Sequence, residues 1–118
     1  MSCIAGLLQD LAPDLEARIQ PQLKGVFGGV VRSYLPQVWE FRTESEKATL
    51  SVDREGKVRA IPGAAKSPDV TIDTSHSRLE AALRTRRRES VPPGPLAVTP
   101  HTEKGRTAFA FLRSRLGL

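Results

Sequence analysis

The chain has 118 residues, of which 39% are hydrophobic and 26% are charged. This length suits one domain, and the composition is too apolar for a disordered chain, so we expect residues 1–118 to form a single domain with one core. The net charge is +5, but residues 1–75 carry −1 and residues 76–118 carry +6. The last third of the chain is therefore predicted to face an anion, a membrane surface or water.

The sequence also excludes several classes of protein. Cys3 is the single cysteine, which excludes an intrachain disulfide and a cysteine zinc cage. No apolar run approaches the roughly 20 residues that span a membrane. The first basic residue is Arg18, so the positive start of a secretory signal is missing. We therefore expect a cytoplasmic protein.

Residues 1–35 are predicted to form helices. Apolar side chains recur at helical spacing between Ile4 and Ile19. Pro13 is typical of a first helical turn, and Pro21 predicts an interruption or a kink. In residues 22–34, valines and a phenylalanine are mixed with three glycines, which we interpret as a loose helix.

Between residues 36 and 74 the hydrophobic period changes to two. Four short stretches alternate apolar and polar side chains, around Trp39, Leu50, Val58 and Ile72. Turn residues separate these stretches, and Gly56 at the end of residues 53–56 (DREG) is one of them. The pattern predicts four strands in an antiparallel meander with one apolar face and one solvated face.

Residues 75–118 are predicted to form a helix, a strand and a last helix. Ser75 and Ser77 are rival N-caps for the first of these helices, and Thr102 is the predicted cap of the last one. Leu96 and Val98 alternate with smaller or polar residues as a fifth strand. The whole order predicts an α+β fold, in which a five-stranded, mainly antiparallel sheet has helices packed on one face.

The sequence shows no catalytic constellation. It lacks a G-x-S-x-G elbow, a P-loop and a dinucleotide G-x-G-x-x-G. His76 and His101 have no His, Cys or Asp at a metal-ligand helical spacing, so we interpret both as structural or solvated. Asp69 and Asp73 fall on the polar side of one strand, which favours a solvated face. We therefore predict that the protein is not an enzyme, with no catalytic residue, metal or cofactor.

Four arginines in five residues form a basic run, Arg84, Arg86, Arg87 and Arg88. Such a run can bind the phosphates of an anionic membrane or of a nucleic acid. The plainer interpretation is a solvated helix end, where the helix dipole favours positive charge. Nucleic acid is disfavoured because no aromatic residue is interleaved with the arginines. A nucleic-acid-binding or protein-interaction module that uses this basic C-terminal face stays as the alternative function.

The last predicted helix carries more apolar surface than a surface helix needs. Phe109, Leu112 and Leu116 form one stripe, and Ala108 and Phe111 lie beside it. Together they cover well over a third of the helix circumference. Such a helix is buried in a core or covers something apolar.

Several short motifs resemble the sterol carrier protein type-two (SCP2-like) family of lipid-binding domains. Residues 67–72 (SPDVTI) are similar to the family's Pro-Asp-Val-Thr-Ile strand, which precedes a serine-capped helix. Residues 53–58 (DREGKV) resemble its Asp-Gly-Lys-Val hairpin, residues 94–99 its Gly-Lys-Leu strand, and the C-terminal helix its Leu-Ala-x-Lys-Leu ending. The resemblance covers roughly residues 39–116. Arg86, Pro95 and Pro100 depart from it, since they stand where the family often has glycine, lysine and glycine.

The resemblance implies a lipid-type cavity between sheet and helices, closed partly by the last helix. It implies non-catalytic binding, and transfer, of a sterol, fatty acid, acyl-CoA or quinone-type lipid. With the apolar alternation, it makes the expected ligand-binding residues Trp39, Phe41, Leu50, Val58, Ile72, Leu79, Leu83, Phe109, Leu112 and Leu116. The expected partners are a lipid or other hydrophobic small molecule and an anionic membrane surface, the latter contacted by Arg84, Arg86, Arg87 and Arg88.

Overall fold

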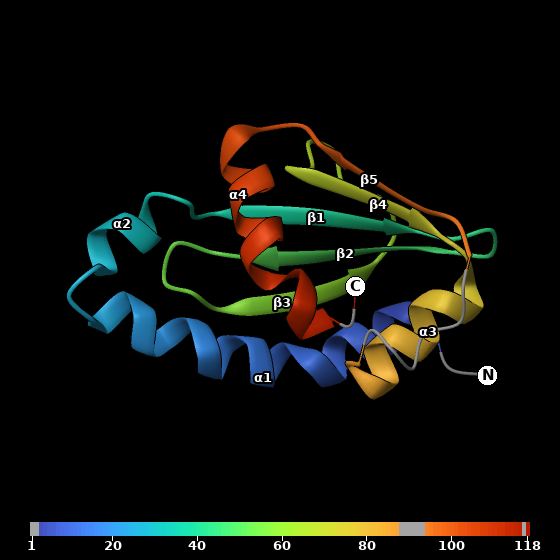
Figure 1. Ribbon diagram of the computed structural model, residues 1–118, viewed down its shortest axis with the longest axis horizontal. Helices are drawn as coiled ribbons and strands as arrows, with labels where there is room; N and C mark the ends of the chain where they lie inside the picture. Colours follow the sequence, from blue (N-terminus) through green and yellow to red (C-terminus); the bar gives the residue numbers. More distant parts are fainter. Residues whose placement is uncertain (1–2, 88–93, 117) are drawn as a thin grey trace.

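The computed structural model describes residues 3–87, 94–116 and 118, leaving aside the side chains of residues 114 and 115. Figure 1 shows an α+β arrangement of one five-stranded sheet with helices against it. In chain order the elements are α1 (Ile4–Lys24), α2 (Gly28–Arg32), β1 (Gln37–Arg42), β2 (Lys47–Val52), β3 (Val58–Pro62), β4 (Val70–Thr74), α3 (His76–Thr85), β5 (Leu96–Pro100), α4 (Glu103–Leu112) and the short 3-10 helix η2 (Arg113–Leu116). In the part of the chain that is described, no helix is long and apolar enough to cross a membrane.

The first helix is longer than the sequence predicts. α1 begins at Ile4, where the Cys3 sulfur accepts a hydrogen bond from the Gly6 N–H, and it continues through Pro13 and Pro21. The predicted helix start at Pro13 and the interruption at Pro21 are therefore wrong. A buried apolar stripe runs along the whole helix, and its packing on the sheet offsets the hydrogen bonds that the two prolines remove. In residues 22–34, the helix appears only as the end of α1 and the five residues of α2.

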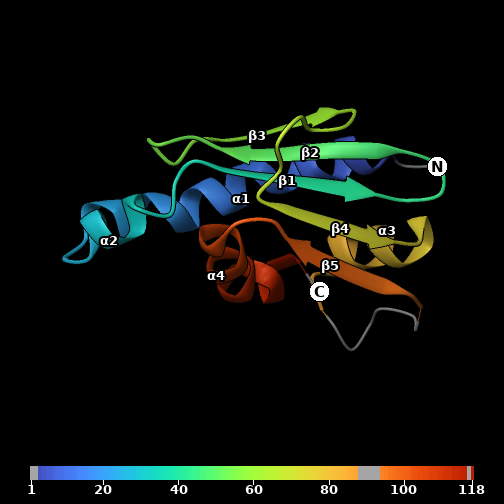
Figure 2. The same cartoon turned by 90° about the horizontal axis from the view of Figure 1, so that it is seen from above.

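The sheet has the strand order β3-β2-β1-β4-β5. The pairs β1–β2, β2–β3 and β4–β5 are antiparallel, whereas β1 and β4 are parallel. The predicted four-strand antiparallel meander is therefore wrong at its fourth strand, which pairs with β1 and not with β3. The reason lies in residues 63–69, which run from β3 to β4 across the face of the sheet opposite the helices (Figure 2). The Ala65 N–H donates to the Glu40 carboxylate of central β1 at 3.3 Å and anchors this crossing.

The two faces of the sheet differ as the alternation predicts. Trp39, Phe41, Leu50, Val70 and Ile72 are buried in one continuous core with the helices. The opposite face carries the polar partners of the same strands, but the crossing segment and the β5–α4 connection cover part of it. The Thr49 hydroxyl donates to the Gly63 carbonyl at 2.9 Å, and Thr49 is buried. This face is therefore polar but not fully solvated.

The helices lie on the apolar face, which confirms the predicted fold class. α1 runs along β3 and β2, with α3 beside it, and α4 lies across β1, β4 and β5 (Figure 1). α1 also satisfies the open edge of β3, because Gln9 donates to the Ala60 carbonyl at 3.2 Å and Glu16 accepts from the Val58 N–H at 3.0 Å. Pairing an edge in this way blocks unwanted strand addition. Thr102 caps α4 as predicted, and Ser75, not Ser77, caps α3.

Candidate functional site

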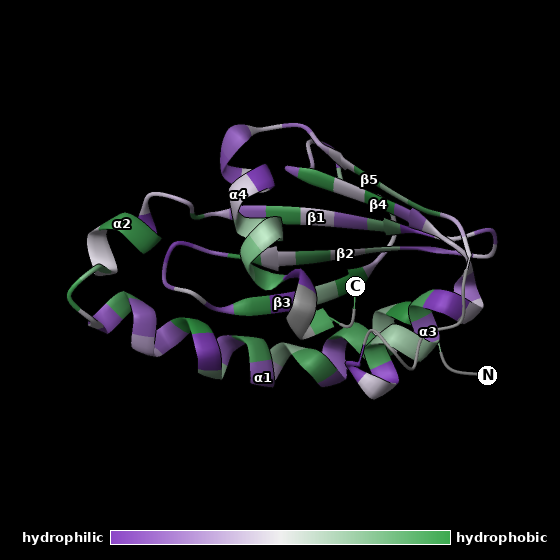
Figure 3. Ribbon diagram, viewed as in Figure 1, coloured by the Kyte–Doolittle hydropathy of each residue, from purple (hydrophilic) through white to green (hydrophobic). Residues whose placement is uncertain are grey.

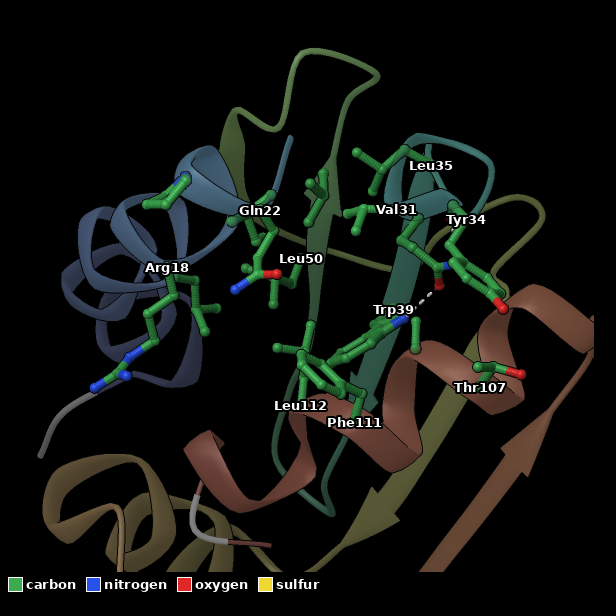
Figure 4. Close-up of a pocket in the computed structure, with 16 residues that line it drawn as sticks. Arg18, Gln22, Val31, Tyr34, Leu35, Trp39, Leu50, Thr107, Phe111 and Leu112 are labelled. Atoms are coloured by element: carbon green, nitrogen blue, oxygen red, sulfur yellow. Dashed lines mark hydrogen bonds between the residues drawn. The ribbon is translucent and has the colours of Figure 1, made fainter. Parts of the chain in front are cut away.

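A pocket of about 460 Å³ opens between α1, α2, the sheet and α4. Figure 4 shows its side chains converging from these four elements. α4 lies across β1 near one end of the sheet while the second half of α1 lies along β2 and β3, and the pocket is the space that these two helices leave between them. Its lining residues are Leu15, Arg18, Ile19, Pro21, Gln22, Val31, Tyr34, Leu35, Gln37, Trp39, Leu50, Val52, Thr107, Ala108, Phe111 and Leu112.

Trp39 and Gln37 of β1 form an ordered part of the wall. The Gln37 side chain is 3% exposed, and its amide accepts from the Trp39 indole N–H at 2.9 Å. The same amide donates to the Tyr34 carbonyl at 2.6 Å and to the Lys104 carbonyl at 3.1 Å. Gln37 thus joins the α2–β1 connection to α4 and fixes the orientation of the indole. On its other side, Trp39 packs edge-on against Phe109, with ring centroids 5.3 Å apart.

The rim of the pocket is more exposed than its wall. Phe111 of α4 is 73% exposed and borders the opening. Arg18 and Gln22, one helical turn apart on α1, are exposed on the other side. Arg18 is the one charged residue of the lining. The chemistry of this wall suits an apolar molecule, with polar groups confined to a few positions.

Three of the ten predicted ligand-binding residues, Trp39, Leu50 and Leu112, line this pocket. The other seven are buried in the core away from its lining, where α1, α3 and η2 fill the remaining inner face: Phe41, Val58, Ile72, Leu79, Leu83, Phe109 and Leu116. Their contact with a ligand stays a prediction. Alternation identifies the inner face of a strand, but the packing of helices decides where on that face a cavity is left.

Sequence reasoning missed the N-terminal contribution to the pocket. α1 supplies five lining residues, and α2 with its connection to β1 supplies Val31, Tyr34 and Leu35. The signal was present in the apolar residues of 22–34, whose mixture with glycines obscured both the helix and the direction of each side chain. Ala108 and Phe111, which stand beside the predicted stripe of the last helix, also line the pocket.

The predicted anionic-surface run is partly neutralised. Arg84 pairs with Glu80 at 3.0 Å, and Arg86 pairs with Asp14 of α1. Arg87 is exposed. Arg88 lies outside the described residues. The contact of these arginines with a membrane stays a prediction, but two of them already have carboxylate partners within the chain.

The predicted solvated position of Asp69 is wrong, because the side chain is buried. Its carboxylate accepts from the Val38 N–H and the Thr102 hydroxyl, each at 2.9 Å. Asp69 therefore joins the start of β1 to the cap of α4, a structural role. Asp73 is half-exposed and pairs with Arg42 at 3.3 Å.

The histidines have protein partners, in line with a structural interpretation. The His101 Nε2 lies 2.9 Å from the Thr71 hydroxyl. His76 lies within 3.5 Å of the carboxylates of Glu46 and Glu80. Among the residues with a described position, no group of three or more His, Cys, Asp or Glu side chains is arranged to hold a metal ion.

The sheet order, the helices on one face and the crossing segment together define an α+β fold, and this fold is similar to that of a solved SCP2 structure. A solved structure described as "UbiJ-SCP2 Ubiquinone synthesis protein" matches it with a TM-score of 0.56 and 19% sequence identity, over 99% of this chain and 95% of that chain. No family model matches the sequence, and no curated protein does. At this identity the likeness concerns the fold. It confirms the fold that residues 39–116 predict, and it extends the likeness to the N-terminal helices.

Proposed function

We propose that this domain binds a hydrophobic small molecule, of the sterol, fatty acid, acyl-CoA or quinone-type lipid class, without catalysing a reaction on it. The pocket between α1, α2, the sheet and α4 is the observation that carries the proposal. Its volume of about 460 Å³ falls in the range of small-molecule sites, roughly 300–1,000 Å³. The solved neighbour is described as a ubiquinone synthesis protein, which agrees with a ligand of this class.

The composition of the wall supports an apolar ligand. Leucine, isoleucine, valine and aromatic side chains make up most of it, and each methylene group that leaves water contributes about 0.8 kcal/mol. An acyl or isoprenoid segment of several carbons therefore offsets the cost of association by burial alone. Binding of this kind needs no catalytic residue, and release to an acceptor membrane would make the domain a carrier.

The first experiment asks what the purified protein carries. Native mass spectrometry and organic extraction are expected to show a bound lipid. Addition of a fatty acid to the delipidated protein is expected to change the emission of Trp39, which is the single tryptophan of the chain and lines the pocket. A protein that is empty on purification and takes up neither fatty acid nor quinone would refute the proposal.

A matched pair of variants on α4 locates the site. Ala108 lines the pocket, whereas Ala110 of the same helix is exposed outside it. We expect Ala108→Phe to fill part of the pocket and lower ligand uptake about tenfold or more, the loss of a few buried methylene groups. Ala110→Phe should bind as the parent does. Val31→Phe, which fills the pocket from the opposite wall, repeats the test independently of α4. Equal uptake by all three variants would place the ligand elsewhere.

A further inference from the structure

The corner between α1 and α2, residues 24–32, lies at one end of the molecule (Figure 1) and includes hydrophobic residues (Figure 3). Val26 is 96% exposed, Phe27 71% and Val30 56%. They account for three of the five large hydrophobic residues that are exposed in the described chain. Single exposed apolar residues are ordinary, but a cluster of this kind marks an interaction site.

The backbone holds these side chains outward. The Gly28 N–H donates to the Gly25 carbonyl at 3.0 Å, and the Val31 N–H donates to the Phe27 carbonyl at 3.0 Å. A Cβ on Gly28 would lie 2.1 Å from the Leu23 carbonyl oxygen, so the turn requires glycine there. Leu23 is thereby turned into the core, and Val31 into the pocket wall, while Val26, Phe27 and Val30 between them are exposed.

The corner is also cationic. Lys24 and Arg32 are exposed at its two ends, and neither forms an ion pair within the described residues. The sequence has no acidic residue between Glu16 and Glu40. The β2–β3 turn, which carries Asp53 and Glu55, contacts α1 where Gln20 donates to the Glu55 carbonyl at 2.7 Å.

We propose that this corner docks on an anionic lipid bilayer, with Val26, Phe27 and Val30 in the interfacial region and Lys24 and Arg32 against the headgroups. Apolar and aromatic side chains flanked by basic ones suit that surface, since burial and attraction to anionic lipid act together. A second copy of the chain fits less well. A stable interface buries at least about 1,200 Å², more than three side chains supply, and the flanking cations of two copies would repel each other.

The position of the corner gives the docking a consequence for the pocket. Val31 faces the pocket from the same short helix that carries Val30 on its exposed side. A bilayer held at this corner therefore lies beside the pocket wall formed by α2. Exchange of a ligand there rests on the proposed function, but docking does not, and the two can fail separately.

The test measures sedimentation with vesicles of equal parts phosphatidylglycerol and phosphatidylcholine at low salt, about 50 mM, where surface charges act strongly. Phe27→Ser is expected to lower binding about tenfold or more, because the variant has no phenyl ring to bury in the bilayer. Ile61→Ser is the matched control, since Ile61 is 59% exposed on β3, away from the corner. Equal loss in both variants, or loss in neither, overturns the proposal.

The charge is tested in the same way. Lys24→Gln with Arg32→Gln should lower binding to the anionic vesicles about twenty-fivefold, at about fivefold per charge, and should leave the weaker binding to pure phosphatidylcholine unchanged. Arg59→Gln, at an exposed arginine of β3, should have a much smaller effect. Loss of binding in a variant with Arg86, Arg87 and Arg88 replaced by Ser, with full binding in the Lys24 and Arg32 variant, would assign the membrane contact to the arginine run and overturn the proposal.

Insertion has its own readout. Cys3→Ser retains an N-cap oxygen at the start of α1 and leaves no other cysteine. A polarity-sensitive dye on Val26→Cys in this background should shift to shorter wavelength on vesicles, and the same dye on Ile61→Cys should not. A concentration-dependent shift without vesicles, together with a dimer in sedimentation velocity, would identify a second copy as the occupant and refute the membrane proposal. A delipidated protein that takes up no lipid but still docks would refute the proposed function and leave this inference intact.

Discussion

Replacing Gln37 by methionine tests whether one buried amide holds the pocket wall together. Methionine keeps the length and most of the volume of the side chain but cannot make its hydrogen bonds. Three bonds are lost, to the Trp39 indole, the Tyr34 carbonyl and the Lys104 carbonyl. Each contributes about 1 kcal/mol net, and a buried donor without a partner costs more. We therefore expect the free energy of unfolding to fall by about 3 kcal/mol.

The assay is urea unfolding followed by far-ultraviolet circular dichroism, with the indole N–H resonance of Trp39 as a local probe. The matched control is Gln9→Met, because the exposed Gln9 amide makes one bond, to the Ala60 carbonyl. The control should lose less than about 1 kcal/mol. If Gln37→Met loses no more than Gln9→Met, or leaves the Trp39 resonance where it was, the amide does not fix the indole and the reasoning is refuted.

Three further predictions concern single positions. Arg86 ends α3 with its backbone in the left-handed region, at φ 55°. The variant Arg86→Gly should therefore be about 1 kcal/mol more stable than Arg86→Ala in thermal unfolding, because both lose the same surface ion pair and only alanine keeps the backbone strain. Equal stabilities of the two variants would refute this. A Cβ on Gly105 would lie 2.5 Å from the Asp69 carbonyl oxygen, so Gly105→Ala should cost about 2 kcal/mol or more in urea unfolding; a neutral result would mean that α4 shifts freely. The backbone N–H groups of Glu44 itself and of His76 lower the Glu44 pKa, so an NMR titration should find it below its usual value, and its contribution to stability should be lost as pH falls through the folded pKa.

The strands were predictable because their signal is local. Trp39, Leu50 and Ile72 each stand in a run of period two, and such a run fixes which face is buried before any partner is known. The order of the strands was not predictable in the same way. A short loop favours pairing with the preceding strand, yet residues 63–69 reach across the sheet, and the Glu40 carboxylate that anchors them carries no signal of this role in the sequence.

The candidate site was predictable in part, for a related reason. The spacing of Trp39 and Leu112 in the sequence predicts that both lie on an apolar face. The pocket itself is the space between helices, and its place depends on how α1 and α4 pack. The length of α1 depends on burial that outweighs two prolines. Gly28 decides the direction of the α1–α2 corner, and its effect appears only when the Leu23 carbonyl is placed against it.

The distribution of charge shows most clearly how sequence and surface differ. Arg86 belongs to the densest basic run of the chain. Its ion-pair partner Asp14 lies 72 residues away in the sequence and becomes a neighbour only through folding. Attraction to an anionic surface depends on the charge that remains after such pairing. Lys24 and Arg32 are two charges against the four of the arginine run, yet no carboxylate pairs with them within the described residues. The cationic surface used in docking is therefore expected at the corner between α1 and α2, although the last third of the chain carries a net charge of +6.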